Sequence, residues 1–169
     1  MTELTQEHLK ELLSYDPETG IFTNLTQRGK RIKIGGVAGF KGNGYVRIEI
    51  DYKTYQAYRL TWLYTYGEFP ETFLDHINEI RDDNRLVNLR LATRQENHHN
   101  ISTPNKNNAS GLRGVCWHKF SGKWRAQIMI NGRVKYLGNF DTAEQASKAY
   151  VTAKRELHPF WEEKTIRGL

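Results

Sequence analysis

The chain has 169 residues, 25 Lys and Arg against 19 Asp and Glu, a formal charge of +6, and 12% aromatic residues. This length suits one domain or two small ones, and the aromatic content argues against a disordered chain. No apolar run approaches a membrane span and the first residues lack a signal-peptide pattern, so we expect a cytoplasmic protein, not secreted and without a membrane partner. The single Cys116 excludes an intrachain disulfide and a cysteine zinc finger.

The positive charge is concentrated in the C-terminal third of the chain. Residues 1–104 contain 13 basic and 14 acidic residues, whereas residues 105–169 contain 12 and 5. A second basic stretch, residues 26–60, has eight basic residues against Glu49 and Asp51. Such segments bind polyanions because Lys and Arg release counterions from phosphates. On charge alone, a nucleic-acid partner and a merely solvated surface both stay open.

The first half of the chain predicts short elements of both kinds. Apolar residues recur at helical spacing near the N-terminus, and a turn signal with Asp, Pro and Gly follows at residues 16–20. Short strand-like runs follow, of which residues 45–50 alternate with Val46, Ile48 and Ile50 on one face. Gly67 to Pro70 ends a further helix. The expected elements are a helix over residues 4–13, strands over 20–24, 37–40, 45–50 and 54–57, and a helix over 58–66.

A polar, Asn-rich break at residues 100–110 coincides with the change in charge and predicts a linker. Three strands are expected after it, over residues 114–118, 124–130 and 134–140. Ser121-Gly122 and Asn131-Gly132 separate these strands, and Asn-Gly is a strong hairpin signal. Thr142 with Gln145 forms a capping box that opens a helix with one apolar stripe. This part therefore predicts a three-stranded antiparallel sheet packed on one helix.

One cluster of residues between the two basic regions carries hydrolytic chemistry. Asp75 and His76 follow a predicted strand, and Thr93 with Glu96 forms a capping box that places Asn97 on a helix. Asp75 and Asn97 offer oxygen ligands to a hard divalent cation, and His76 can accept a proton from water near neutral pH. These are the components of metal-assisted phosphodiester hydrolysis.

Strand geometry limits this interpretation. Neighbouring residues on a regular strand point to opposite faces, so Asp75 and His76 serve one site only if the strand ends there. An Asp-His pair without a catalytic role therefore stays open on spacing alone.

The order of these motifs resembles the HNH (His-Asn-His) endonucleases of phage and mobile-intron type, over about residues 58–100. The matching pieces are Tyr58-Arg59-Leu60-Thr61-Trp62, Asp75-His76, Asn84 to Arg90 and Thr93 to Asn97. The resemblance implies a ββα-metal fold without structural zinc, with His76 as general base and one Mg²⁺ or Mn²⁺ on Asp75 and Asn97. It implies that Asn88 holds the loop and orients the histidine.

Two departures from the family pattern and two additional features accompany this resemblance. The last motif position is Asn97 rather than His; a shifted register would make His98 the ligand, and His98 and His99 are otherwise exposed helix residues. Glu79 stands where the family often has Gly, which changes the loop. Residues 15–22 resemble the leader of phage members and predict a small sheet that supports the nuclease. The basic run of Arg28, Lys30, Arg31 and Lys33 either touches the DNA backbone or forms a solvated hairpin.

The predicted C-terminal sheet carries a second constellation. Residues two apart share a face of a strand, so Arg125 and Gln127 lie together, opposite Trp124, Ala126 and Ile128. A basic, polar face of this kind can enter a major groove, where Arg reads guanine and Gln reads adenine. A helix-covered sheet with a soluble outer face is the alternative.

Residues from about 110 to 158 resemble a plant ethylene-response-factor (APETALA-type) DNA-binding domain in the order and spacing of Gly111 to Val115, Gly122 to Ile128 and Tyr136 to Ala146. The resemblance implies a sheet that binds the major groove with a helix behind it. The implied DNA contacts are Arg113, Trp124, Arg125, Gln127, Arg133, Lys135 and Tyr136. Gln127 and Cys116 depart from the usual residues, so sequence preference should differ, and Cys116 is expected to be a packed residue.

Together these features predict an α+β protein. Its expected parts are an N-terminal small sheet with the ββα-metal HNH module over residues 1–100, a linker over 101–110, an ethylene-response-factor-like domain over 111–158, and a tail over 159–169. The expected function is a metal-dependent endonuclease of homing type that cuts double-stranded DNA, without a small-molecule cofactor. If phage-encoded, it works in the host cytoplasm, and a monomer that nicks one strand is favoured. The alternative is a DNA-binding regulator with an inert nuclease fold.

Overall fold

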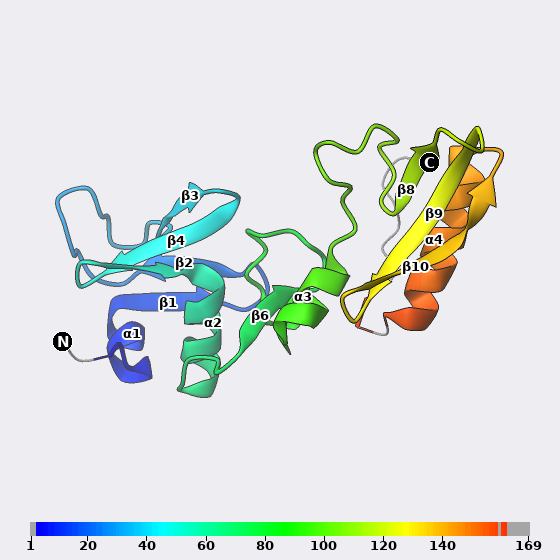
Figure 1. The fold of residues 1–169 in the computed structure, drawn as a ribbon. Coiled ribbons are helices and arrows are strands. Elements are labelled where there is room, and N and C mark those ends of the chain that lie inside the picture. The colour runs from blue at the N-terminus through cyan, green and yellow to red at the C-terminus, as the bar shows by residue number, and fades with distance from the viewer. Residues whose placement is uncertain (1–2, 159, 162–169) are drawn as a thin grey trace. The chain divides into compact units, whose positions relative to one another are not determined.

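The computed structural model describes residues 3–158 and 160–161. Most of the expected tail, 159–169, therefore lies outside the described residues. The chain divides into two compact units, one ending at Asn97 and the other starting at His98 (Figure 1). Among the described residues, no helix has the length and apolar character needed to cross a membrane.

The N-terminal unit starts with a short helix that turns directly into a strand. Helix α1 (Gln6–Leu12) begins after Thr5, whose side chain accepts a hydrogen bond from the His8 backbone. Leu13 is extended and begins β1 (Leu13–Asp16), which pairs antiparallel with β2 (Ile21–Asn24). The helix expected over residues 4–13 therefore ends at Leu12. Leu13 instead pairs with Asn24 in the sheet, where its side chain is fully buried.

A three-stranded antiparallel sheet follows, with β4 (Tyr45–Ile50) between β3 (Phe40–Gly42) and β5 (Lys53–Gln56). The strand expected over residues 37–40 is wrong, because Val37 makes only an isolated bridge to Thr23. Gly39 turns the chain there with φ +100°, and a Cβ on it would lie 2.6 Å from the Arg47 carbonyl oxygen. Only this backbone bend lets β3 start beside β4.

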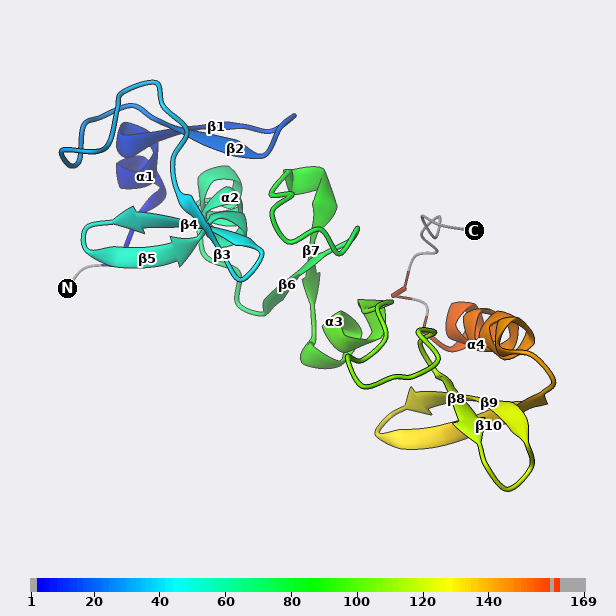
Figure 2. The same ribbon diagram turned by 90° about the horizontal axis from the view of Figure 1, so that it is seen from above.

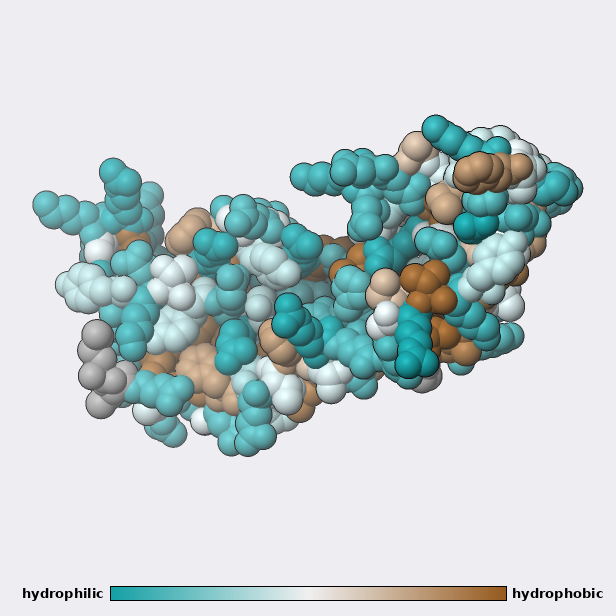
Figure 3. Space-filling model, in the orientation of Figure 1, coloured by the Kyte–Doolittle hydropathy of each residue, from teal (hydrophilic) through white to brown (hydrophobic). Residues whose placement is uncertain are grey.

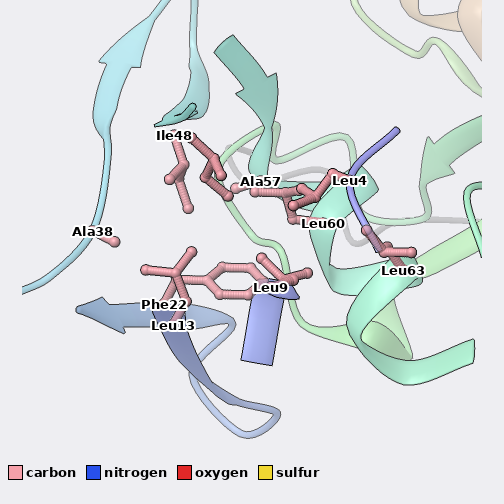
Figure 4. Packing of buried hydrophobic residues seen from close by; sticks show 10 residues of the cluster. Leu4, Leu9, Leu13, Phe22, Ala38, Ile48, Ala57, Leu60 and Leu63 are labelled. Carbon is pink, nitrogen blue, oxygen red and sulfur yellow. The ribbon is translucent and has the colours of Figure 1, made fainter. Parts of the chain in front are cut away.

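Helix α2 (Ala57–Tyr66) starts directly after β5 and ends at Gly67, which is left-handed with φ 84°. The core of this unit lies where α1, α2 and the strands meet (Figure 4). Its members are buried apolar side chains from α1, β1, β2, β4 and α2 and from the segments that precede α1 and β3. They are Leu4, Leu9, Leu13, Phe22, Ala38, Ile48, Ile50, Ala57, Leu60 and Leu63.

A ββα arrangement completes the N-terminal unit. Strand β6 (Phe73–His76) pairs antiparallel with β7 (Leu89–Ala92), and a 3₁₀ turn, η1 (Leu86–Asn88), leads into β7. Helix α3 (Arg94–Asn100) then crosses the boundary between the units. The capping box expected here is present, because the Thr93 hydroxyl accepts from the Glu96 backbone and the Glu96 carboxylate accepts from the Thr93 backbone.

The C-terminal unit is the predicted three-stranded sheet on one helix. The strands β8 (Val115–His118), β9 (Lys123–Ile130) and β10 (Arg133–Phe140) pair antiparallel in the order β10-β9-β8. Helix α4 (Ala143–Leu157) covers one face of the sheet (Figure 2) and starts with the expected capping box of Thr142 and Gln145. The α+β class is confirmed.

Buried side chains explain the close packing of α4 on this sheet. Val115, Ala126 and Ile128 face the helix, where Ala146 and Tyr150 meet them. The register shifts between Tyr136 and Gly138, so the extra residue, Leu137, also packs in this core.

Gly114 is required where the chain enters β8. It has φ +73°, and a Cβ would lie 2.0 Å from the Tyr150 ring. Gly114→Ala should therefore lower the free energy of unfolding of this unit by about 1–2 kcal/mol through the left-handed backbone and by about 1–3 kcal/mol more through overpacking. Urea unfolding followed by tryptophan fluorescence measures this loss.

Gly111→Ala is the matched control, because Gly111 has φ +66° and nothing lies within 4 Å of its added Cβ. It should show the backbone loss alone. Equal losses for both variants would show that the Tyr150 ring moves aside at no cost.

Candidate active site and nucleic-acid interface

Asp75 and His76 are the last two residues of β6. His76 is the last residue of the strand and pairs with Leu89, whereas Asp75 pairs with Arg90. Both side chains are buried, with 5% and 6% of their surface exposed. A carboxylate and an imidazole buried side by side need specific partners, which the surrounding elements supply.

Two aromatic rings surround the His76 imidazole. Tyr58 from α2 meets it edge-on with ring centres 5.1 Å apart, and Tyr45 from β4 lies 6.0 Å away. The two tyrosine rings contact each other at 5.7 Å, and the Arg81 guanidinium lies 5.2 Å from the centre of the Tyr45 ring. We call Tyr45 and Tyr58 the aromatic pocket.

Burial in this pocket determines the protonation of His76. Desolvation lowers the pKa of His76 to about 4, although the nearby Asn84 side chain and the charge of Asp83 favour the protonated form. At neutral pH the imidazole is therefore neutral and can accept a proton.

Asn88 holds the loop that follows His76. Its side-chain oxygen accepts from the Asn78 backbone at 3.0 Å, and its side-chain nitrogen donates to the Asp83 carbonyl at 2.9 Å. Its own carbonyl accepts from the Ile77 backbone at 2.9 Å. Every polar group of this buried amide is thus used inside the protein, which leaves Asn88 in a structural position beside the site.

Further polar side chains stiffen the same loop. Asp83 accepts from Asn78 and from Arg85, both at 2.6 Å, and the Arg85 hydrogen bonds lower the pKa of Asp83. Glu79 has φ 59°, a left-handed conformation that favours glycine. The loop thus keeps its turn without glycine.

The N-terminal hairpin also contacts this loop. The Tyr15 hydroxyl donates to the Asn84 carbonyl and accepts from the Leu86 backbone, each at 3.0 Å. Gly20 permits this approach, since a Cβ there would lie 2.5 Å from the Arg85 backbone nitrogen. β1 and β2 therefore support the start of η1.

Arg90 is a partner of Asp75 that the sequence reasoning missed. Its Nε donates to the Asp75 carboxylate at 3.2 Å, and only 19% of the Arg90 side chain is exposed. The cross-strand position of Arg90 could have been found by pairing the two predicted strands. Tyr45 was likewise missed, because nothing in its own strand points to a histidine some thirty residues further on.

The two expected metal ligands both carry oxygen atoms that suit a hard cation. Asp75 offers a carboxylate oxygen, and Asn97, which is partly buried on α3, offers an amide oxygen. Mg²⁺ keeps several waters and is often bound by one or two protein ligands, so two oxygen donors fit it. In the part of the chain that is described, no three His, Cys, Asp or Glu side chains gather to hold a metal.

The outer face of the C-terminal sheet, away from α4, carries some of the expected DNA contacts beside the exposed apolar side chains of Met129 and Val134. Register places Arg125 beside Cys116 and Asn139, and Gln127 beside Tyr136. The Arg125 guanidinium lies 5.3 Å from the centre of the exposed Tyr136 ring. Arg125, Gln127 and Tyr136 therefore form one continuous surface. Cys116 is exposed on it, so the expectation of a packed cysteine is wrong.

The other expected DNA contacts lie elsewhere. Arg133 and Lys135 pair with Ile130 and Ile128 and so belong to the helix side of the sheet, where both are exposed. Trp124 is partly buried on that side, against Trp117 at 5.2 Å. Arg113 precedes β8 and donates to the Thr103 carbonyl at 2.7 Å. Thus three of the seven expected contacts share the outer face.

Comparison with known proteins assigns both units. Residues 55–99 match the HNH endonuclease family and residues 110–158 match the AP2 domain family. Thus the ββα arrangement belongs to an HNH endonuclease domain and the sheet with α4 to an AP2 domain.

Relatives support both assignments. Protein 3.8 of Escherichia phage T7 is 35% identical over 108 residues, which cover 63% of this chain and 88% of the phage protein. An uncharacterized HNH endonuclease of Acanthamoeba polyphaga mimivirus is 34% identical over 54% of this chain and 46% of its own length. APETALA2-like protein 2 of Oryza sativa is 40% identical over 28% of this chain and 11% of its own. No solved structure matches. The chain belongs to the HNH endonuclease family and carries an AP2 domain.

The aromatic pocket gives a direct prediction for His76. In metal-free protein, Tyr58→Ala should admit water and raise the pKa of His76 from about 4 toward its usual value of about 6.5. NMR titration of the imidazole measures this shift. Because wild-type His76 stays neutral while an unfolded chain protonates, acid between these two values should favour unfolding of the wild type more than of the variant.

Tyr66→Ala, at an exposed position of the same helix, is the control and should leave the titration unchanged. If Tyr58→Ala titrated like the wild type, the pocket would not be the source of the desolvation.

Proposed function

We propose that this protein is a metal-dependent endonuclease that hydrolyses phosphodiester bonds of double-stranded DNA. The observation that carries the proposal is the pair of Asp75 and His76 at the end of β6, with His76 buried and neutral in the aromatic pocket. This pair lies inside the segment that matches the HNH endonuclease family.

His76 acts as the general base in this proposal. A neutral imidazole takes a proton from the attacking water, and the surrounding tyrosine rings hold its orientation. Asn88 is a positioning residue, because its hydrogen bonds with backbone groups hold the chain directly after His76. The products are expected to have 5′-phosphate and 3′-hydroxyl ends.

Asp75 and Asn97 would hold the single divalent cation, Mg²⁺ or Mn²⁺. When bound, such a cation stabilises the charge that develops on the scissile phosphate. Arg90 restrains the Asp75 carboxylate through one oxygen and thereby presents the carboxylate from a fixed direction. The proposed nuclease module requires no structural zinc in addition to this cation.

The AP2 domain supplies affinity and part of the choice of target. Arg125, Gln127 and Tyr136 form its central surface, and Arg113, Trp124, Arg133 and Lys135 are proposed as further contacts. Arg and Gln read guanine and adenine edges in a major groove. We assign residues 1–100 to the nuclease part, 101–110 to a linker and 111–158 to the DNA-binding part.

We infer a homing or mobile-element role in the cytoplasm of a phage-infected cell, without a small-molecule cofactor. A monomer with one metal site cuts one strand per binding event, so nicking is the expected product. A regulator with an inert nuclease fold is the second candidate. The buried, oriented histidine argues against it, because DNA binding alone has no use for such a group.

His76→Ala should abolish cleavage while DNA binding persists. Loss of the general base lowers the rate by about 10²–10⁴-fold. The assay uses supercoiled DNA with candidate phage or host target sites, incubated with Mg²⁺ or with EDTA. Nicked or linear product should form only with wild-type protein and Mg²⁺.

His98→Ala is the control, since His98 is exposed on α3 and adjacent to the proposed ligand. It should cut as the wild type does. Cutting by His76→Ala at the wild-type rate would refute the assignment of the base, whereas loss of activity in His98→Ala would indicate the alternative register.

Arg125→Ala should weaken binding to a cognate duplex by about 1–3 kcal/mol and relax specificity at one base pair. Gel shifts on a set of single-base-substituted duplexes measure both effects. Lys148→Ala removes an equal charge from the exposed side of α4 and should change little. Equal effects of the two variants would contradict the outer face as the reading surface.

A further inference from the structure

The N-terminal unit has a basic loop, residues 25–36, between β2 and β3. From residue 25 to residue 48 the chain contains six basic residues and no acidic one, although residues 1–104 as a whole are almost neutral. The charge of this segment is therefore concentrated, whereas a surface adapted only for solubility mixes both signs.

Hydrogen bonds hold both ends of the basic loop together. The Asn24 backbone donates to the Gly36 carbonyl at 2.9 Å and accepts from the Gly35 backbone at 2.8 Å. The buried Asn24 side chain also donates to the Gly36 carbonyl at 2.9 Å. The loop thus starts and ends at one fixed point of the sheet.

The Arg28 side chain forms hydrogen bonds within the protein that hold the basic loop against the sheet. Its guanidinium donates to the Asn24 side chain at 2.9 Å and to the Glu49 carbonyl, and burial lowers the pKa of Arg28. Lys30, Arg31 and Lys33, in contrast, are exposed. Hydrophilic side chains project from the surface over this loop (Figure 3). One cation fixes the loop and three point to solvent.

Apolar side chains accompany these cations. Ile34, Val37 and Phe40 are 68%, 70% and 53% exposed. Cations interleaved with exposed apolar groups suit a ligand that offers both phosphates and apolar surface. A DNA strand presents phosphate oxygens beside sugars and thymine methyl groups. A second copy of the chain would bring an equally basic loop and be repelled.

We propose that the basic loop is a second DNA-binding surface, on the nuclease unit, in which Lys30, Arg31 and Lys33 contact the phosphate backbone. The inference rests on the proposed function, because duplex DNA is the ligand in both. It adds a sequence-independent contact to the reading surface of the AP2 domain. Binding should therefore depend on salt more steeply than the AP2 sheet alone accounts for.

The full chain is tested by fluorescence anisotropy on a mixed-sequence duplex, in EDTA to prevent cleavage, over a series of salt concentrations. The triple variant Lys30→Gln, Arg31→Gln, Lys33→Gln should reduce the slope of log affinity against log salt by about 2.7, which is about 0.9 for each lost phosphate contact. The control variant Lys10→Gln, Lys148→Gln, Arg155→Gln removes the same charge from exposed positions of α1 and α4.

The expected result is a reduced slope for the loop variant only. Equal slopes for the loop variant and the wild type would overturn this inference and leave the nuclease proposal intact. If the wild type bound no duplex, the proposed function itself would fail.

A second measurement avoids the removal of charge. In a Cys116→Ser background, Ile34→Cys carries a benzophenone photo-crosslinker on the exposed side of the loop, and Thr152→Cys carries it on α4. DNA should cross-link from position 34 and not from position 152. Binding without a cross-link from position 34 would overturn the proposal.

Discussion

The candidate active site depends on the hydrogen bonds that Asn88 makes with backbone groups of the neighbouring loop. Its amide and carbonyl join Ile77, Asn78 and Asp83, so the long connection between β6 and β7 closes directly behind His76. Without this closure, β6 would continue or fray, and Asp75 and His76 would not share one end of a strand. A buried amide with every polar group satisfied makes such a closure rigid, because any movement would expose unpaired groups.

The second constraint is the burial of an imidazole between aromatic rings. Tyr45 and Tyr58 remove water from His76 and keep it neutral, while Arg90 balances the charge of Asp75 on the other strand. The Arg90 cation thus stabilises the charge of the buried carboxylate, whereas desolvation favours the neutral form of the buried histidine. The two adjacent residues therefore have different electrostatic surroundings.

Much of the fold followed from local patterns. The capping boxes of Thr93 and Thr142 and the turn at Asn131-Gly132 were correct, because caps and tight turns are determined by residues that are close in sequence. The strand expected over 37–40 failed for the opposite reason. A short strand-like run indicated an extended segment there, but the chain bends at Gly39, where it packs closely against the Arg47 backbone.

The two DNA-binding features show the same division. The order of basic and aromatic residues after residue 110 indicated a sheet with a reading face, and Arg125 and Gln127 do share it. The register between β9 and β10, however, places Arg133 and Lys135 on the opposite face. The sequence of one strand alone does not say which of its two faces joins that of Arg125 and Gln127. The exposure of Cys116 likewise depends on which face α4 covers.

By itself, the sequence indicated most of the element types, the motif order and the candidate residues for hydrolysis and DNA recognition. Only the tertiary structure decided which side chains surround them. Tyr45, Tyr58 and Arg90 reach the Asp75-His76 pair from β4, α2 and β7, and Asn24 and Arg28 fix the basic loop. The physical reason is that desolvation and pairing of charge arise between segments distant along the chain, and no local pattern records those contacts.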